Sequence, residues 1–72
     1  MKTYSLKNKP PEEEMVYMRK KGLIKVYKTK EDCILEQIYC KTKVPKGDYI
    51  VFDKIYLYSM KASDIESNWV EI

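Results

Sequence analysis

The sequence predicts an α+β domain dominated by a small antiparallel sheet of two hairpins, with one helix before them and a short helical turn near the C-terminus. The strongest signal is the segment 46–58, in which a turn at Pro45–Asp48 leads into two apolar runs separated by Asp53–Lys54. Both runs are rich in β-branched and aromatic residues, which suit a pleated, half-buried surface. The other signals are helix-type ends around residues 11–22 and a second pair of strand-like runs over residues 23–39. We expect the hairpin over 46–58 at the centre of the sheet.

Length and composition allow one small core. The chain has 72 residues, of which 44% are hydrophobic, and it includes seven tyrosines, one tryptophan and one phenylalanine. This is enough apolar surface for a folded core rather than a disordered chain. A domain of this size keeps about 3–5 kcal/mol of net stability, so little remains to support a deep, strained active-site cavity. We expect a single domain over residues 1–72, which oligomerisation would help to stabilise.

Residues 1–9 are expected to form a short edge strand that stops at Pro10–Pro11. Tyr4 and Leu6 would share one face of this strand, and its lysines would discourage pairing with the edge of another chain. Because prolines have no backbone N–H, they cannot continue the pairing.

Residues 11–22 carry the end signals of a helix on both sides. Pro11 suits the first helical position, and three glutamates follow it at the positive end of the helix dipole. Three cations precede Gly22, which can take the left-handed conformation just past a helix. The apolar face is less regular, because Arg19 falls among the apolar residues. We expect a helix whose methionines pack on the core.

A first hairpin is expected where two strand-like runs flank a polar turn. The strands are residues 23–28 and 33–39, and the turn is residues 29–32. Alternation places Ile24 and Val26 on one face of the first strand and Tyr27 on the other. The second strand alternates less cleanly, so the pattern does not decide its register.

Residues 40–47 are expected to form a basic loop that holds Lys41, Lys43 and Lys46 beside the sheet. Loops held by a rigid sheet often carry contact surfaces, so this loop is a candidate binding site. The alternative is a solvated linker.

The C-terminal region is expected to hold a helical turn and a last strand. Ser63 is a candidate N-cap, and Glu66 follows it at the spacing of a capping box. Residues 69–72 can close as a short strand. Trp69 and Ile65 are expected to cover one end of the core, since a single tryptophan in so small a domain is usually buried.

The residues that most enzymes need are missing from the chain. Without any histidine, it lacks the commonest general base, the commonest metal ligand and any Ser-His or Cys-His pair. It contains no GxxxxGKS/T, GxGxxG or CxxC motif, and its two glycines cannot build a phosphate-binding loop. Asp48 follows Gly47 directly, which is typical of a side chain that hydrogen-bonds within a turn rather than of a catalytic acid. We expect neither an enzyme nor a bound cofactor or metal.

Cys33 and Cys40 match no metal or redox spacing. In one continuous strand they would lie on opposite faces and more than about 20 Å apart, whereas a disulfide needs Cα atoms within about 7 Å. We expect free thiols, which fits a cytoplasmic protein. No run of about 18 apolar residues is present and the N-terminus has no apolar run of signal-peptide length, so we expect no membrane contact.

The charge is mildly basic, at +3 from 14 Lys and Arg against 11 Asp and Glu. Tyrosine offers large contact area at low entropy cost, and aromatic residues are enriched at interfaces. We therefore expect a protein-binding surface built from tyrosines and the basic loop. Its candidate residues are Tyr27, Lys41, Lys43, Lys46, Tyr56 and Tyr58. The alternative is a small nucleic-acid-binding module in which the same residues stack on bases and contact phosphates.

The central hairpin and its flanks resemble a group of small uncharacterised phage and prophage proteins. Their C-terminal half carries a Gly-Asp-Trp/Tyr-Ile-Ile block and then an aromatic block with Cys-Lys-Pro-Asp, and their lysine-rich start ends in Lys-Pro. The matching residues here are Gly47–Val51 for the first block, Tyr56–Tyr58 and Lys61 for the second, and Lys9–Pro10 near the start. Met60 and Ala62 depart from the cysteine and the proline of the group.

The resemblance implies a phage or mobile-element context rather than a mechanism, because that group has no established activity. Small cytoplasmic phage proteins without catalytic chemistry typically bind and block or redirect a host macromolecule, including defence nucleases. We therefore expect a non-enzymatic accessory protein in the host cytoplasm that binds and modulates or inhibits a host protein, as anti-CRISPR proteins do. The partner is expected to be a host or phage macromolecule, protein rather than nucleic acid. Whether the chain also forms a homodimer is left open by the sequence. Binding to single-stranded nucleic acid that weakens steeply with salt would favour the alternative function.

Overall fold

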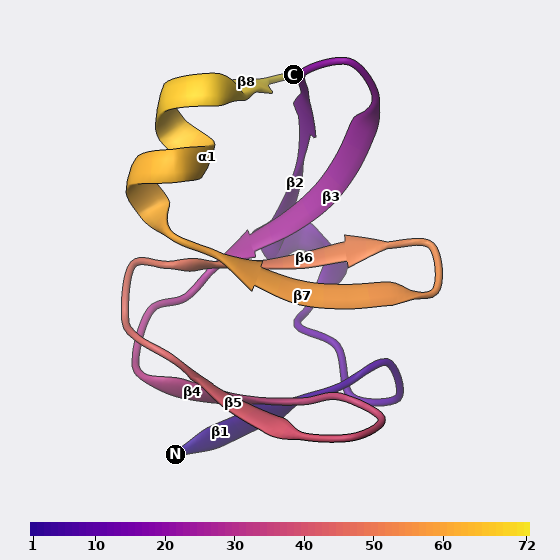
Figure 1. Cartoon of the computed structure of the whole chain (residues 1–72), viewed down its shortest axis with the longest axis vertical. Coiled ribbons are helices and arrows are strands. Elements are labelled where there is room, and N and C mark those ends of the chain that lie inside the picture. Colours follow the sequence, from indigo (N-terminus) through magenta and orange to yellow (C-terminus); the bar gives the residue numbers. More distant parts are fainter.

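The computed structural model describes residues 1–72 and contains eight strands, one 3₁₀ turn and one α-helix (Figure 1). Their bounds are β1 Lys2–Tyr4, η1 Glu12–Glu14, β2 Met15–Arg19, β3 Leu23–Lys28, β4 Cys33–Glu36, β5 Lys41–Val44, β6 Tyr49–Asp53, β7 Tyr56–Met60, α1 Ala62–Asn68 and β8 Val70–Glu71. The fold is mostly β, so the expected α+β class describes it only loosely. Its single α-helix falls short of the length and apolar character that a membrane crossing requires.

The strands form two sheets rather than the single sheet that the sequence predicts. One sheet has three strands in the order β1-β4-β5, in which β1 runs parallel to β4. The other has five antiparallel strands in the order β7-β6-β3-β2-β8. The three-stranded sheet packs on one face of the five-stranded sheet, and α1 packs on the other (Figure 1). The five-stranded sheet is therefore the middle of three layers.

Two buried clusters on opposite faces of the five-stranded sheet make up the core. Between the sheets, Tyr27 and Ile50 pack in one cluster with Leu35 of the smaller sheet. Under α1, Val26 packs in the other cluster with Ile65, the one buried residue of the helix. Successive residues along β3, and likewise along β6, therefore face opposite clusters. Because both faces of β6 are covered, this strand lacks the polar face of a half-exposed strand.

The central hairpin is confirmed, with its turn shifted by one residue. β6 and β7 pair as far as Asp53↔Tyr56, so the turn residues are Lys54 and Ile55. Lys54 has a φ of +57°, in the left-handed region that tight hairpin turns use. β6 lies between β7 and β3 inside the sheet, whereas β7 is an edge strand.

The helix predicted over residues 11–22 is wrong. Only Glu12–Glu14 form a turn of 3₁₀ helix, and Met15–Arg19 continue as β2. This strand pairs along its whole length with β3, and its end also pairs with β8. Met15 and Met18 lie in different core clusters, which an extended strand between two apolar layers allows. The helix-type signals are local, and pairing with β3 overrides these local signals. The glycine expected to end the helix, Gly22, has no positive φ.

The hairpin predicted over residues 23–39 is also wrong, although both of its strands exist. β3 pairs with β2 and β6, while β4 pairs with β1 and β5 in the other sheet. Residues 29–32 therefore cross from one sheet to the other instead of turning back. Residues 40–47 are not a simple loop, because Lys41–Val44 form β5 beside β4. Alternation says which residues share a face but not which strands pair, so the sequence pattern could not exclude the wrong hairpin.

The two ends of the chain follow the prediction in part. β1 is an edge strand, as expected, but it ends at Tyr4 before a Ser5–Asn8 turn rather than at the prolines. α1 begins after Lys61 and has no cap from Ser63. β8 closes the five-stranded sheet as the predicted last strand, and the tryptophan packs against the cluster under α1.

Candidate functional site

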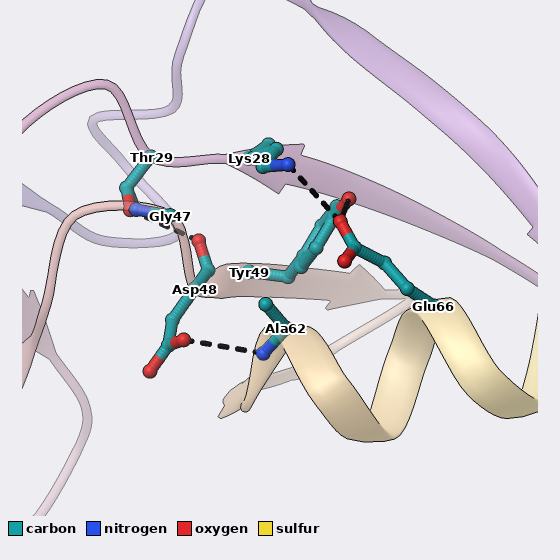
Figure 2. A network of polar contacts seen from close by, with 7 residues as sticks. All are labelled: Lys28, Thr29, Gly47, Asp48, Tyr49, Ala62 and Glu66. Carbon is teal, nitrogen blue, oxygen red and sulfur yellow. Dashed lines mark hydrogen bonds and ion pairs between the residues drawn. The ribbon is translucent and has the colours of Figure 1, made fainter.

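The Gly47-Asp48-Tyr49 block, which carries the phage resemblance, joins the two sheets and the helix (Figure 2). Gly47 has a φ of +94°, a conformation that L side chains rarely adopt. Its N–H donates to Thr29 Oγ1 at 2.9 Å, and the Thr29 N–H donates to the Asp48 carbonyl at 2.9 Å. Asp48 Oδ1 accepts the Ala62 N–H at 3.1 Å and so caps the start of α1. The block therefore ties the two segments that cross between the sheets to each other and to the start of α1, and its aspartate is used in a structural bond.

The same block holds α1 a second time through Glu66 on the helix (Figure 2). Tyr49 Oη donates to Glu66 Oε2 at 2.8 Å, and Lys28 Nζ donates to the same oxygen at 3.0 Å. The hydrogen bond from Tyr49, followed by that from Lys28, lowers the pKa of Glu66 below its usual value. Burial, followed by the bond to Glu66, raises the pKa of Tyr49. The carboxylate of Glu66 is thus favoured in its ionised form.

This contact predicts that the domain loses stability in acid. Because the pKa of Glu66 is lower in the folded chain than in the unfolded chain, its contribution is complete above the unfolded value of 4.5 and is lost as the pH falls through the folded value. Thermal unfolding followed by circular dichroism should show a Tm that falls below pH 4.5. Glu66→Gln should lower the Tm at neutral pH and shrink the fall in acid. Glu71→Gln is the control, because it removes a carboxylate that forms no ion pair. If the two variants changed the Tm equally at each pH, the assignment to Glu66 would be wrong.

The tyrosines predicted for a binding surface do not come together on one face. The expectation that Tyr27 is exposed is wrong: it is buried between the sheets, and its ring meets that of Tyr4 with centroids 5.4 Å apart. Burial, followed by interaction with Tyr4, raises the pKa of Tyr27 to about 12. Tyr58 is half-buried against the cluster under α1, whereas Tyr56 is 64% exposed. Tyr27 could not be placed from the sequence because β3 has a packed layer on each of its faces.

Two of the three predicted lysines are paired with acids across the β4–β5 side of the domain. Lys41 Nζ lies 3.8 Å from a Glu36 carboxylate oxygen, and Lys43 Nζ lies 3.9 Å from an Asp32 carboxylate oxygen. Lys46 lies in the turn before β6, where its backbone N–H donates to Asp32 Oδ1 at 2.8 Å. The expected basic loop is therefore a strand and a turn with interleaved charges rather than a continuous cationic patch.

Both hairpins end in an exposed Ile-Tyr pair, and the two pairs line one groove. Ile38 and Tyr39 at the β4–β5 tip are 84% and 96% exposed, and Ile55 and Tyr56 at the β6–β7 tip are 76% and 64% exposed. The two tips lie on the same side of the domain, beside the loop that follows β1 (Figure 1). The groove has a volume of about 550 Å³, and its other lining residues are Ser5, Leu6, Lys7, Glu36, Gln37, Cys40 and Leu57. We call it the tip groove.

Gln37 holds the β4–β5 tip in place. Its N–H donates to the Cys40 carbonyl at 2.8 Å, which bridges the base of the tip. Its side-chain Nε2 donates to the Leu57 carbonyl on β7 at 2.7 Å, and its Oε1 accepts a hydrogen bond from Thr42 Oγ1 at 3.1 Å. One side chain thus links the two sheets, so the width of the tip groove is set by the folded chain rather than by a single loop.

Sequence reasoning missed Ile38, Tyr39 and Ile55 because it placed all three inside strands. Hairpin tips favour Gly, Asn, Asp and Ser, which suit the backbone of a turn. The signal that could have found the groove is the repeat of the Ile-Tyr dipeptide, once in each strand pair. The pairing of the strands, however, decides whether the two dipeptides stand at hairpin tips and whether those tips lie on the same side of the domain.

The rim of the tip groove carries unpaired positive charge. Glu36 is the only acid among the lining residues, and it is paired with Lys41. Lys7 lines the groove, and Lys54 stands next to Ile55 at the β6–β7 tip, where it lines a neighbouring hollow rather than the groove itself. Neither lysine forms an ion pair. The groove therefore combines apolar walls with a cationic edge.

A second, smaller hollow is lined by residues of β2, β3 and the β6–β7 tip, together with Lys9. It has a volume of about 320 Å³, and its lining includes Lys9, Tyr17 and Lys25. Lys25 is held by Glu12 at 2.9 Å and lies over the Tyr17 ring, 5.6 Å from its centroid. Lys25 and the Tyr17 ring are thus already partners of each other, whereas Lys9 and Lys54 in the same lining form no ion pair.

The carboxylates and thiols do not gather into a metal site. No set of three His, Cys, Asp or Glu side chains is placed to hold a metal ion. Cys33 is buried, Cys40 is exposed, and both are free thiols. Burial raises the pKa of Cys33, which keeps its thiol protonated at neutral pH. Cys40 lines the tip groove, so it is an accessible thiol that can report on the groove.

Comparison with known proteins gives no match for this chain among protein-family models, curated proteins or solved structures. The phage resemblance therefore stays a prediction from the sequence motif. The role of the Gly47-Asp48-Tyr49 block in joining the sheets and the helix gives that motif a structural reason (Figure 2).

Proposed function

We propose that this chain is a non-enzymatic accessory protein that binds a partner protein through the tip groove, and that in the phage context suggested by its sequence it modulates or inhibits a host protein. The observation that carries the proposal is the pair of exposed Ile-Tyr tips around one groove. Contiguous exposed apolar side chains mark interaction sites on soluble proteins. Aromatic anchors in such a setting supply much of the binding energy of an interface.

The distribution of charge favours a protein partner over nucleic acid. A nucleic-acid surface needs free cations beside exposed aromatic rings. Of the residues expected for that role, Lys41 and Lys43 are paired with acids and Tyr27 is buried. The tip groove offers only Lys7 and the neighbouring Lys54 as unpaired cations, too few for the positively charged groove that follows a nucleic-acid backbone. The walls of the tip groove are mostly apolar, which suits a protein segment better than a phosphate backbone.

A capture experiment with matched variants tests the proposal. The wild-type chain and the variant Ile38→Ser/Tyr39→Ser would be immobilised and incubated with bacterial lysate at low and moderate salt, and the bound proteins would be identified by mass spectrometry. We expect wild type to capture one host protein at both salt concentrations and the tip variant to lose it. The control is Tyr17→Ser/Leu23→Ser, which removes exposed apolar side chains that do not line the tip groove.

The control variant should capture the same protein as wild type. Loss of capture by the control and retention by the tip variant would contradict the proposal. Binding of wild type to single-stranded DNA or RNA that falls steeply between low and moderate salt would favour the nucleic-acid alternative. Circular dichroism should show the wild-type fold for both variants, because Ile38 and Tyr39 are almost fully exposed and Tyr17 and Leu23 belong to neither core cluster.

A further inference from the structure

Strand β7 is an edge strand whose outer side lies along the tip groove. In a two-residue hairpin the closing pair, here Asp53↔Tyr56, exchanges hydrogen bonds, and the next pair does not. This alternation turns the peptide groups of Leu57 and Ser59 away from β6. The Leu57 carbonyl has this direction, since it accepts Gln37 Nε2 at 2.7 Å from outside the sheet. The edge therefore presents backbone groups to an extended chain.

Gln37 occupies the place that the backbone amide of such a chain would take. Its side-chain amide donates to Leu57 with the chemistry and distance of a strand-to-strand bond. The Leu57 N–H donates to no turn, loop or side chain, and the N–H and carbonyl of Ser59 form no such hydrogen bond either. A side-chain amide thus reaches the Leu57 carbonyl from outside the sheet, and the backbone groups beside it have no partner from a turn, loop or side chain.

Lysines stand at both ends of β7. Lys54 precedes the strand, Lys61 follows it, and neither forms an ion pair. Lys7 on the groove adds a third unpaired cation, against two unpaired acids, Asp53 beside Lys54 and Asp64 in the first turn of α1 after Lys61. A second copy of β7 would bring its own lysines to this edge, which disfavours pairing between copies. Acidic residues at the ends of an added strand would be attracted.

We propose that the partner contributes an extended segment that adds as a strand to the edge of β7, with large apolar side chains at alternate positions and Asp or Glu at its ends. This inference rests on the proposed function and names its binding mode. The backbone of the segment bonds to Leu57 and Ser59. Gln37 releases the Leu57 carbonyl to the incoming amide, while its bonds to Cys40 and Thr42 keep the β4–β5 tip in shape and the added strand takes over the link between the two sheets. Every second side chain of the segment enters the tip groove between the two Ile-Tyr tips.

A library of random peptides displayed on phage, selected against the full chain, supplies the probe. The selected sequences should alternate large apolar residues with others and carry Asp or Glu at their ends. The best peptide should slow the alkylation of Cys40 by iodoacetamide, because Cys40 lines the groove while Cys33 is buried. Lys54→Glu/Lys61→Glu should weaken binding of that peptide about tenfold or more at low salt.

Backbone pairing is tested on both partners. N-methylation of the selected peptide, one residue at a time, should weaken binding about tenfold at every second residue, since each methyl removes one amide donor. Ser59→Pro removes an outward N–H from β7 and should weaken binding by a similar factor, because proline is tolerated on a strand edge. Lys43→Pro makes the corresponding change on the edge of β5 and should bind the peptide as wild type does.

Several results would overturn the strand addition. One is that the selected peptides carry basic ends, and another is that the loss of affinity on N-methylation does not recur at every second residue. A third is a dimer in light scattering that Ser59→Pro abolishes, because the occupant of the edge would then be a second copy of this chain. The N-methyl profile decides even where a proline variant does not fold. If the Ile38→Ser/Tyr39→Ser variant loses host-protein capture but the N-methyl period is absent, strand addition fails and the proposed function stands. If that variant keeps the capture, the proposed function itself fails.

Discussion

Leu35→Ala is expected to leave the domain unfolded or barely folded at room temperature. Leu35 is fully buried on β4, in the cluster between the two sheets. Removing a buried leucine side chain costs about 2–5 kcal/mol, and a domain of this size holds only about 3–5 kcal/mol in total. Urea unfolding, followed by circular dichroism and tryptophan fluorescence, should show a transition midpoint close to zero urea or no cooperative transition at all.

Ile34→Ala is the matched control, because Ile34 is the neighbour of Leu35 on the other face of β4. It is half-buried and belongs to neither core cluster. The variant should keep a cooperative transition with a smaller shift, of about 1 kcal/mol. Equal losses in the two variants would mean that the three-stranded sheet does not pack on the five-stranded sheet through this face.

Thr29→Val is the second large effect, of about 1–3 kcal/mol, although valine has nearly the same shape as threonine. Thr29 is buried where the chain crosses from one sheet to the other. Its Oγ1 accepts the Gly47 N–H at 2.9 Å and lies within donor distance of the carbonyls of Pro45 and Asp48, at 2.9 Å each. Valine would leave these backbone groups with fewer partners away from water, and unmet hydrogen bonds in the interior are costly.

Thr29→Ser keeps the hydroxyl and removes only a methyl group, so it separates hydrogen bonding from packing. We expect its cost to be below about 1 kcal/mol, the value of one buried methyl group. Denaturant midpoints of the two variants, compared with wild type, measure the difference. A larger loss for serine than for valine would show that the methyl contact matters more than the bonds to the turn around Gly47.

The parts of the fold that local chemistry decides could be predicted from the sequence. The hairpin of β6 and β7 follows from two apolar runs around a polar break, and β8 follows from the short apolar end of the chain. The side chain of Asp48 was expected to hydrogen-bond within a turn, yet it caps α1 instead. Its partner lies on an element distant in sequence, so no local rule could have named it.

The candidate site was largely beyond such reasoning. Tyr27 looks like an exposed strand residue by alternation, but the face on which it lies is covered by the smaller sheet. Ile38 and Tyr39 look like strand residues by composition, but β4 ends at Glu36 and leaves them on a tip. In both cases exposure depends on what packs against a strand, which is a property of the whole fold.

The sequence by itself determined that this is one small domain without imidazole chemistry, with free thiols, a hairpin over β6 and β7 and a helix before the last strand. The tertiary structure alone decided that residues 15–19 form a strand, that β3 and β4 belong to different sheets, and that two Ile-Tyr pairs meet at one groove. The physical reason is that turn and strand preferences act over a few residues. Strand pairing and burial are set by contacts between segments distant along the chain.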